Sequence, residues 1–283
     1  MLRELRKVIP SFLERVDRED RGVVWSEYLQ ETREDTADVV AALFPEGSIV
    51  DPSPTVRLVD FDPEGEVKMI ASMMYPHSTM SEDQLERRVA GMNHEDRMAV
   101  ARAYVGDRRN RRHKPGRALE RPFYRFDVLV DYGAFRDLQR HRMLSMDWQN
   151  LSPHHGYISS PLVNAAGMGP VYEEAMERSA ALYDLLVDDF PDQASYAINL
   201  AYKIRFNMNI NARSALHLIE LRTTPQGHPS YREVGQEMHR LIAEEAGHTV
   251  ISEMMKFVDH TDETDLERLQ SERRAQEKRQ STK

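Results

Sequence analysis

The sequence predicts an α+β protein in which a few strands are combined with long helices. Apolar and polar residues alternate in the segments 56–67 and 123–131, which is typical of strands. Apolar residues recur at helical spacing in the segments 193–221 and 229–258, which is typical of long helices. With 283 residues, of which 40% are hydrophobic and 30% charged, the chain is long enough to form one large globular domain.

The first part of the chain is predicted to be a helical N-terminal extension, 1–54. Its apolar residues recur at helical spacing, and it ends in the turn-rich stretch PEGSIVDPSP. The segment 56–67 is expected to form a hairpin, because its alternation surrounds a Pro-Glu-Gly turn. Ser81 is expected to cap a helix that has acidic residues in its first turn.

The middle and the end of the chain are predicted to hold one strand and several helices. The cation-rich run 107–117 is expected to form a mobile or ligand-facing loop, and the strand 123–131 leads into a helical pattern after Gly133. The elements expected next are a loop at 161–170, a helix at 171–189, a single helix at 193–221 and a last helix at 229–258. The residues 259–283 are almost wholly polar, which predicts a disordered tail or a frayed helix and leaves 55–258 as the main domain.

Several kinds of site are excluded because residue types or motifs are missing. A chain without cysteine has no thiolate nucleophile, no Cys-ligated zinc and no iron–sulfur cluster. The sequence has no G-x-S-x-G elbow, no G-x-G-x-x-G after a strand and no Walker A motif. His217, His228 and His239 are evenly spaced, but Pro225 and Gly227 interrupt the helix between them, so we expect no metal site there.

Charge and hydropathy narrow the expected partners. A net charge of -9 and a pI of about 5.7 argue against general nucleic-acid binding. No stretch approaches the roughly 18 consecutive apolar residues that a spanning helix needs. The N-terminus lacks the apolar core of a secretory signal, so we expect a cytoplasmic protein without a membrane partner.

The first candidate site is a cluster of cations in the stretch FRDLQRHRMLSMDWQNLSPHHGY. In a helix, Arg136 and Arg140 would lie one turn apart, and the Arg-His-Arg run 140–142 would spread cations over more than half of the circumference. Guanidinium groups donate forked hydrogen bonds to phosphates and carboxylates, so the cluster is a candidate diphosphate or nucleotide site. Periodicity leaves two alternatives open, a solvated basic face and a salt-bridge patch between chains.

The second candidate site is the run NINARSALHLIELR. Asn209, Arg213 and His217 are spaced by four residues and would form one stripe on the predicted helix, with Arg222 five residues further on. An amide, a guanidinium and an imidazole beside an apolar face indicate recognition of a planar polar ligand. The alternative is that Arg213 only pairs with Glu220 or with another acid.

These two motifs resemble those of the flavin-dependent thymidylate synthases. That family has an Arg-His-Arg signature at a strand-to-helix unit, which is matched here by Arg140, His141 and Arg142. The family's later helix, Asn-x-Arg followed by His or Asn and then Arg, is matched without a gap by Asn211, Arg213, His217 and Arg222. Weaker similarity extends over roughly the main domain, with strands and a last long helix in the expected places.

The resemblance implies an α+β fold with an antiparallel or mixed sheet, and a homotetramer whose flavin sites are each built from several subunits. It implies that FAD is held by Arg140, His141, Arg142, Asn211, Arg213 and His217. Arg222 would bind the uracil ring and favour its ionised form, which makes it the candidate catalytic residue. The implied reaction is C5 methylation of dUMP to dTMP, with methylenetetrahydrofolate and NADPH as co-substrates. A chain without cysteine fits this route and not the unrelated class that attacks uracil with a thiolate.

The sequence departs from the family where the nucleotide is expected. The family's Glu-Leu-Ser-x-Arg-Tyr run is represented by Asn150, Ser152 and His154, which are the candidate substrate-binding residues besides Arg222. A second phosphate-binding arginine falls on Ser195. Two lost charge-assisted bonds of about 1.5–3 kcal/mol each would weaken dUMP binding by orders of magnitude.

Cations of the predicted loop 107–117 could replace the two lost contacts to the phosphate. The cations that could swing into the site from the loop are Arg108, Arg109, Arg111, Arg112, Lys114 and Arg117. Asp137 also stands where the family has a glutamine. Two further functions stay open: an FAD-binding homologue with a different acceptor, and a non-catalytic homologue whose arginines make subunit contacts.

Overall fold

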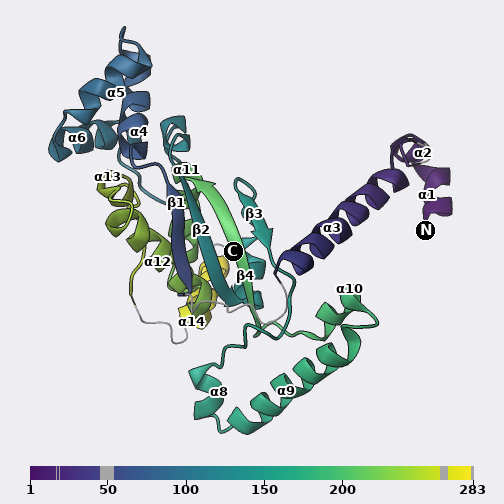
Figure 1. The fold of residues 1–283 in the computed structure, drawn as a ribbon. Coiled ribbons are helices and arrows are strands. Elements are labelled where there is room, and N and C mark those ends of the chain that lie inside the picture. The colour runs from purple at the N-terminus through teal and green to yellow at the C-terminus, as the bar shows by residue number, and fades with distance from the viewer. Residues whose placement is uncertain (17, 19, 45–53, 262–266, 282–283) are drawn as a thin grey trace. The chain divides into compact units, whose positions relative to one another are not determined.

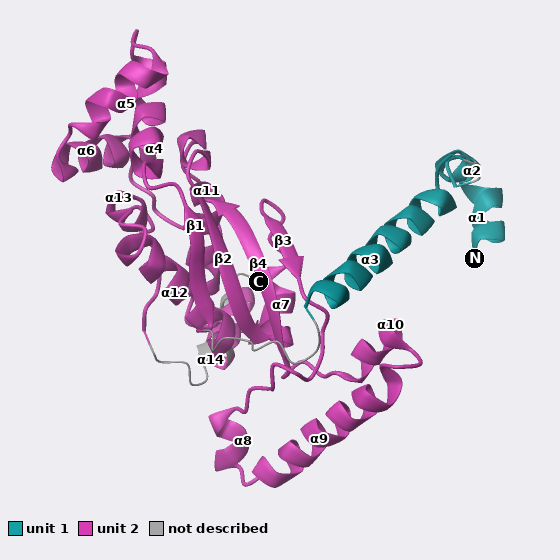
Figure 2. Cartoon of the chain, in the orientation of Figure 1, with its two compact units in different colours: residues 1–52 teal, residues 53–283 magenta. Residues whose placement is uncertain are grey.

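The computed structural model describes residues 1–16, 18, 20–44, 54–261 and 267–281 (Figure 1). The chain divides into two compact units, Met1–Pro52 and Ser53–Lys283 (Figure 2). Among the described residues, no helix is both long and apolar enough to cross a membrane. The candidate site residues all belong to the second unit.

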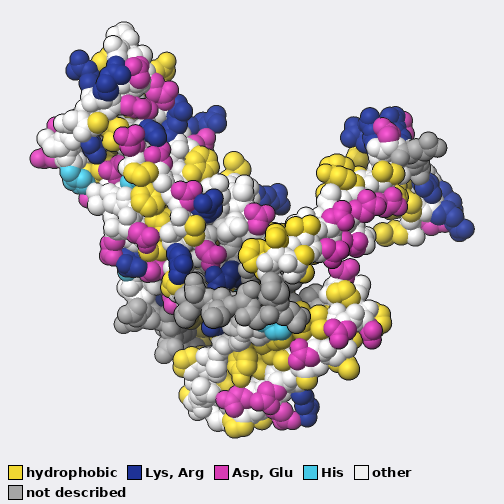
Figure 3. All heavy atoms as spheres, in the orientation of Figure 1, with side chains coloured by type: hydrophobic (Ala, Val, Ile, Leu, Met, Phe, Trp, Pro, Cys, Tyr) yellow, Lys and Arg dark blue, Asp and Glu magenta, His cyan; other side chains and the backbone are white. Residues whose placement is uncertain are grey.

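The described part of the first unit consists of helices and the segments between them. The helices are α1 (Leu2–Val8), α2 (Pro10–Leu13) and α3 (Val23–Leu43), and none of their residues is buried. Hydrophobic and acidic side chains lie side by side along α3, as Figure 3 shows. Trp25 is 61% exposed and Leu43 is 66% exposed, so α3 has no core of its own to pack against.

The second unit is built on a four-stranded antiparallel sheet, which confirms the predicted α+β class. The strands are β1 (Val56–Phe61), β2 (Phe123–Asp131), β3 (Ser145–Trp148) and β4 (Lys203–Asn211), in the order β1-β2-β4-β3. The central pair β2 and β4 is in register over its whole length, from Phe123 opposite Asn211 to Asp131 opposite Lys203. The predicted strand 123–131 is therefore confirmed.

Helices surround the sheet and bury one of its faces. They are α4 (Gly65–Met74), α5 (Glu82–Ala90), α6 (His94–Val105), α7 (Tyr132–Leu138), α8 (Pro161–Ala165), α9 (Gly169–Leu186), α10 (Pro191–Ala194), α11 (Ala212–Arg222), α12 (Pro229–Glu244), α13 (Thr249–Glu253) and α14 (Glu267–Ser281), with 3-10 turns at Tyr75–His77, Arg117–Glu120 and Ser195–Ala197. Alternate residues of β2 and β4, such as Tyr124, Phe126, Phe206 and Met208, belong to the main core. The helices α11 and α12 contact the sheet, and α12 lies along β1 and β2 (Figure 1).

The predicted hairpin at 56–67 is wrong, because only its first half is a strand. β1 ends at Phe61, and α4 starts at Gly65. The Asp62 carboxylate accepts a hydrogen bond from the backbone N–H of Glu64 and pairs with Lys68, so the turn leads into a helix rather than back into the sheet. The predicted cap at Ser81 is confirmed, with a full capping box that includes Gln84.

The single helix predicted at 193–221 is also wrong. Residues 203–211 form β4, and its buried residues alternate as Ile204, Phe206, Met208 and Ile210. The helical spacing of Ile198, Tyr202 and Phe206 concealed this alternation, because every fourth residue satisfies both periods. The last predicted helix is interrupted as well: α12 ends at Glu244 and α13 follows Gly247, whose φ of 69° terminates the helix. The expected loop at 161–170 contains the short helix α8.

Candidate functional site

The predicted cofactor residues meet at one cavity of about 460 Å³. It is lined by Arg140, His141, Arg142, Asn211, Arg213, His217 and Arg222, together with Lys114 and Glu120. The two motifs are separated by about seventy residues of sequence, and the sheet brings them together. The structure thus places the first seven residues in one site. The role of the first six in binding a flavin, and that of Arg222 in binding a uracil ring, stay predictions.

The passage from β4 into α11 positions the second motif. Asn211 is the last residue of β4, and its side-chain oxygen accepts a hydrogen bond of 2.9 Å from the backbone N–H of Ser214. This N-cap starts α11 directly after the strand. The predicted stripe of Asn209, Arg213 and His217 on one helix is therefore wrong, because Asn209 lies in β4 while Arg213 and His217 lie on α11.

Arg222 is held by two residues, Asp137 of α7 and His141 in the segment that follows it. Its Nε donates to His141 Nε2 at 3.1 Å, and its Nη1 donates to Asp137 Oδ1 at 3.3 Å. Its Nη2 donates to the backbone oxygen of Asp137, and the guanidinium lies over the ring of Tyr231 at 5.3 Å. The side chain is 13% exposed. Arg222 is therefore fixed at the cavity wall with part of its charge compensated by Asp137.

The two histidines at the cavity are neutral at physiological pH. Burial, followed by the nearby charge of Arg222, lowers the pKa of His141 to about 4. Since its Nε2 accepts from Arg222, its proton is on Nδ1. Burial and then Lys114, Arg111 and Arg222 lower the pKa of His217, and its buried Nδ1 has no hydrogen-bond partner among the described residues. This nitrogen can donate to or accept from a ligand.

Arg213 also lines the cavity and is paired with an acid. It donates to the backbone oxygen of Pro115 at 2.9 Å and to Glu120 Oε1 at 3.1 Å. Pairing of Arg213 with an acid was the alternative that the sequence left open, and the acid is Glu120 rather than Glu220. Glu120 also pairs with Arg117, so its charge is shared between two guanidinium groups.

Glu220 instead forms a buried ion pair with Arg108. Arg108 Nη1 donates to Glu220 Oε1 at 2.7 Å, and the second nitrogen pairs with Oε2 at 2.5 Å. Both side chains are at most 2% exposed. The prediction that Arg108 could swing into the site is therefore wrong, because it anchors the basic loop to α11. Lys114, from the same loop, does line the cavity.

The predicted substrate residues lie elsewhere in the chain. Asn150, Ser152 and His154 follow β3 and do not line the cavity of Arg222. The backbone N–H of His154 donates to the hydroxyl of Ser152 at 3.4 Å, and the ring of His154 lies 6.0 Å from that of Tyr183 on α9. Of the four candidate substrate residues, only Arg222 therefore lies with the candidate cofactor residues in one chain. Glu120 lies in the cavity wall, whereas Asp137 contacts Arg222 without lining the cavity. The sequence signals for Asp137 were its place one helical turn before His141 and its match to the family's glutamine.

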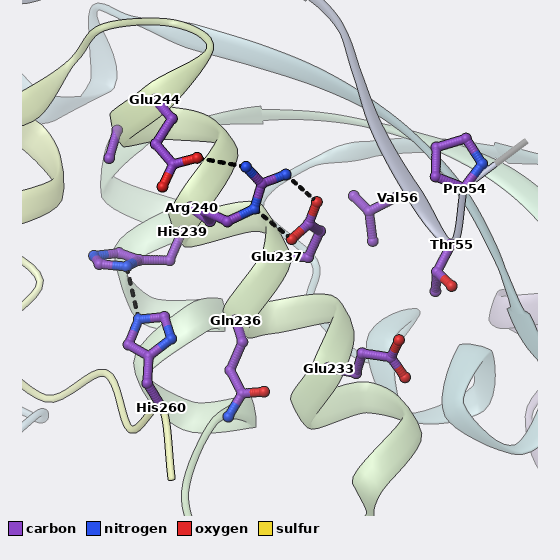
Figure 4. Close-up of a pocket in the computed structure, with 11 residues that line it drawn as sticks. Pro54, Thr55, Val56, Glu233, Gln236, Glu237, His239, Arg240, Glu244 and His260 are labelled. Carbon is purple, nitrogen blue, oxygen red and sulfur yellow. Dashed lines mark hydrogen bonds and ion pairs between the residues drawn. The ribbon is translucent and has the colours of Figure 1, made fainter. Parts of the chain in front are cut away.

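A larger cavity of about 720 Å³ lies beside α12 and does not suit a phosphate-bearing ligand (Figure 4). Its arginine, Arg240, is paired with Glu237 and Glu244, as the dashed lines in Figure 4 show. His239 and His260 are hydrogen-bonded to each other at 3.0 Å in its wall. No group of three potential metal ligands is present in the part of the chain that the structure describes.

Acidification is expected to destabilise the protein. Burial lowers the pKa of His141 from 6.5 to about 4, and it also lowers the pKa values of His217, His239 and His248. Below about pH 6.5 the unfolded chain therefore binds protons that the folded chain does not, so stability is present above this pH and is lost as the pH falls. His141 alone corresponds to a loss on the order of 3 kcal/mol near pH 4.

Urea unfolding at about pH 7.5 and about pH 5 measures this dependence. The His141→Gln variant should show a shallower loss of stability than the unmodified chain, whereas replacement of the exposed His77 should change nothing. An unfolding free energy that is equal at both pH values would contradict the assignment.

Comparison with known proteins gives a consistent set of relatives. Residues 57–247 match the model of a family described as thymidylate synthase complementing protein. A UPF0159 protein of Chlamydia pneumoniae is 38% identical over 275 residues, which cover 96% of this chain and 51% of that protein. A UPF0159 protein of Thermoplasma acidophilum is 33% identical over 77% of this chain and 44% of its own length. The chain thus spans about half the length of the curated relatives it matches.

Solved structures with a similar fold include two uracil-nucleotide enzymes. Thymidylate synthase X from Helicobacter pylori, solved with FAD and dUMP, has a TM-score of 0.50 and 17% identity, covering 71% of this chain and 98% of that chain. The UMP/dUMP methylase PolB from Streptomyces cacaoi, bound to 5-Br dUMP, has a TM-score of 0.53 and 17% identity, covering 72% and 97%. At this identity, the likeness shows a shared fold.

Proposed function

Because this chain belongs to the thymidylate synthase complementing protein family, the flavin-dependent thymidylate synthases, we propose that it binds FAD and methylates a uracil nucleotide at carbon five. The substrate would be dUMP or a related pyrimidine nucleotide, and the product of dUMP would be dTMP. Methylenetetrahydrofolate would supply the carbon and NADPH the hydride. The observation that carries the proposal is the meeting of the two family motifs at one cavity.

The residues at the cavity fit a flavin dinucleotide. Arg140, which is 70% exposed on its side chain, and Arg142 would bind the diphosphate from the rim, and Lys114 adds a third cation. The buried, unpaired Nδ1 of His217 would meet a polar edge of the ring system. When bound, the flavin would supply the redox and carbon-transfer chemistry, and the chain would supply position and charge.

Arg222 would act on the uracil ring. A buried guanidinium stabilises negative charge on a neighbouring ring more strongly than an exposed one, because little water screens it. His141 would hold Arg222 in place and, through its Nδ1 proton, would donate to a ligand in the cavity. Asp137 would limit the charge that Arg222 presents, and so would the backbone carbonyl that it contributes.

The nucleotide phosphate would need residues from outside this cavity. Asn150, Ser152 and His154 do not line it, so we propose that they reach the equivalent site of a neighbouring subunit in a homotetramer. This arrangement would account for a cavity in one chain that is lined by the candidate cofactor residues and Arg222 but not by the other candidate substrate residues.

A binding experiment tests the cofactor proposal. Purified protein should show visible flavin absorbance after incubation with FAD, and Arg140→Ala should weaken FAD binding by about ten- to a hundredfold, because one charge-assisted contact to a phosphate is lost. Arg136→Ala is the matched control, since Arg136 is one turn earlier, equally exposed and absent from the cavity wall. A protein that remains colourless with FAD would contradict the proposal.

A second candidate keeps FAD but changes the acceptor. The absence of Asn150, Ser152 and His154 from the cavity of Arg222 favours it, because a nucleotide phosphate would lack these contacts within one chain. Release of tritium from C5-labelled dUMP, UMP and deoxyuridine distinguishes the two candidates. A preference for UMP or deoxyuridine would identify the different acceptor.

A further inference from the structure

The apolar residues of α3 form one stripe along the helix (Figure 3). The stripe residues recur at alternating intervals of four and three residues, which keeps them on one face of the helix. They are Trp25, Leu29, Thr32, Thr36, Val39 and Leu43. The four members other than the threonines are between 44% and 66% exposed. α3 therefore presents to solvent a face of the kind that helices normally bury.

The two threonines in the middle of the stripe are compatible with burial. The Thr36 hydroxyl donates to the backbone oxygen of Thr32 at 2.6 Å, and the Thr32 hydroxyl donates to the backbone oxygen of Leu29 at 3.2 Å. Both protons are thus used within α3. A partner that covers the stripe leaves neither hydroxyl group without a hydrogen bond, and the methyl groups of both threonines are available for packing.

The opposite face of α3 is acidic and suits contact with water. Glu27, Glu31, Glu34 and Asp38 share this face. The only basic residue of α3 is Arg33. Helices that lie on a membrane surface carry basic polar faces, which anionic lipids attract, whereas these lipids would repel an acidic face. The stripe therefore suits another protein helix better than a lipid surface.

The spacing of the stripe is that of a coiled-coil seam. Alternating intervals of four and three residues give a repeat of 3.5 residues, and α3 keeps this repeat without a break from Trp25 to Leu43. In heptad terms, the d positions are Trp25, Thr32 and Val39, and the a positions are Leu29, Thr36 and Leu43. A strict repeat of this kind allows two identical helices to pack against each other along their whole length.

The residues beside the seam favour a parallel pair. In a parallel, in-register pair, Arg33 of one copy lies beside Tyr28 of the other, and a guanidinium is attracted to the face of a tyrosine ring. Asp35 of one copy then lies beside the uncharged Val40 of the other. An antiparallel pair would instead bring Arg33 close to Arg33 and Asp35 close to Asp35. Like charges at this distance repel each other.

We propose that α3 pairs with α3 of a second copy of this chain as a parallel, in-register, two-stranded coiled coil. The second copy supplies the apolar face that α3 otherwise lacks, since none of its residues is buried in the single chain. The proposal concerns the first unit and does not depend on FAD, on the nucleotide or on the homotetramer proposed above. A short seam with two threonine layers makes a weak pair, so a covalent trap is the suitable measurement.

The pairing can be measured with one introduced thiol, because the chain has no cysteine. Val39→Cys places two thiols in one d layer, where a parallel pair brings the Cα atoms to about 6 Å, within disulfide distance. Glu34→Cys is the matched control on the acidic face. Under mild oxidation of the full chain, Val39→Cys should form disulfide-linked dimers at least about tenfold faster than Glu34→Cys. Equal rates would overturn the proposal.

A mixture of two variants tests the orientation. An antiparallel pair would place Val39 of one copy opposite Leu29 of the other and would hold the two Val39 positions about 15 Å apart. Leu29→Cys and Val39→Cys chains, mixed in equal amounts and oxidised, should therefore link 29 to 29 and 39 to 39. Mass spectrometry of the linked peptides identifies the pairs. A majority of links from 29 to 39 would contradict the parallel arrangement.

A charge placed in the seam tests its packing. Added to the Val39→Cys chain, Leu29→Glu should slow cross-linking at least about tenfold, because two carboxylates then meet in one a layer. Ala41→Glu adds the same charge on the acidic face and should leave the rate unchanged. Equal rates in these two variants would refute the seam. Flavin absorbance of the same samples should not change, so failure of the proposed function and failure of this pairing give different results.

Discussion

Arg222→Ala should lower the rate of uracil methylation by about 10²- to 10³-fold or more while FAD remains bound. Arg222 is the last residue of α11, is 13% exposed and lies in the wall of the cavity that holds both family motifs. Its loss removes the buried positive charge that would stabilise an ionised uracil ring. Tritium release from C5-labelled dUMP measures the rate, and flavin absorbance measures the retained cofactor.

Two further variants test the assigned roles: Arg222→Lys tests the geometry of Arg222, and Arg213→Ala tests the contribution of Arg213 to FAD binding. The lysine keeps a charge but loses the forked geometry that reaches both His141 and Asp137, so it should restore only part of the rate. Arg213→Ala should weaken FAD more than it slows turnover at saturating FAD. The opposite pattern, with FAD lost from Arg222→Ala and retained by Arg213→Ala, would overturn both assignments.

Glu220→Gln should lower the free energy of unfolding by about 3–5 kcal/mol. Glu220 is fully buried, accepts two hydrogen bonds from Arg108 and a third, of 3.3 Å, from the backbone N–H of Phe257. The substitution leaves the Arg108 guanidinium buried and charged with no anion to compensate it. Urea unfolding followed by circular dichroism measures the loss.

Glu237→Gln is the matched control for this loss. Glu237 pairs with Arg240 on the surface of α12, where both side chains are partly exposed, so the change should stay within about 1 kcal/mol. Replacing Arg108 with Met and Glu220 with Leu together should recover part of the stability, because neither charge is then buried alone. If Glu220→Gln is as stable as the unmodified chain, the buried pair does not anchor the basic loop.

The elements that were predicted correctly are those whose signals are local. The Ser81 cap depends on residues within one helical turn, and the alternation of β2 is uninterrupted over its whole length. β4 was mistaken for a helix because its buried residues also fit helical spacing and no turn residue separates it from α11. The pairing with β2, nearly eighty residues away in the sequence, and with β3 makes 203–211 a strand.

The candidate site was also predicted only in part: its motif residues could be identified from the sequence, but the residues they pair with could not. The motif residues could be recognised by their order in the chain, and the structure brings all seven to one cavity. Their partners could not: Arg222 meets Asp137 across 85 residues, and Arg213 meets Glu120 across 93. Charge pairing between distant segments has no periodicity, so a single sequence offers several equally plausible acids for each arginine.

Because β4 continues directly into α11, insertions and deletions in this part of the chain should not be tolerated. Asn211 ends the strand and caps the helix, so no loop residue lies between the sheet and the arginines of α11. One residue inserted into β4 would turn its alternate side chains to the opposite face and rotate Arg213, His217 and Arg222 by about 100° around the helix axis. The stretch from Lys203 to Arg222 should therefore accept substitutions but keep a constant length among functional relatives.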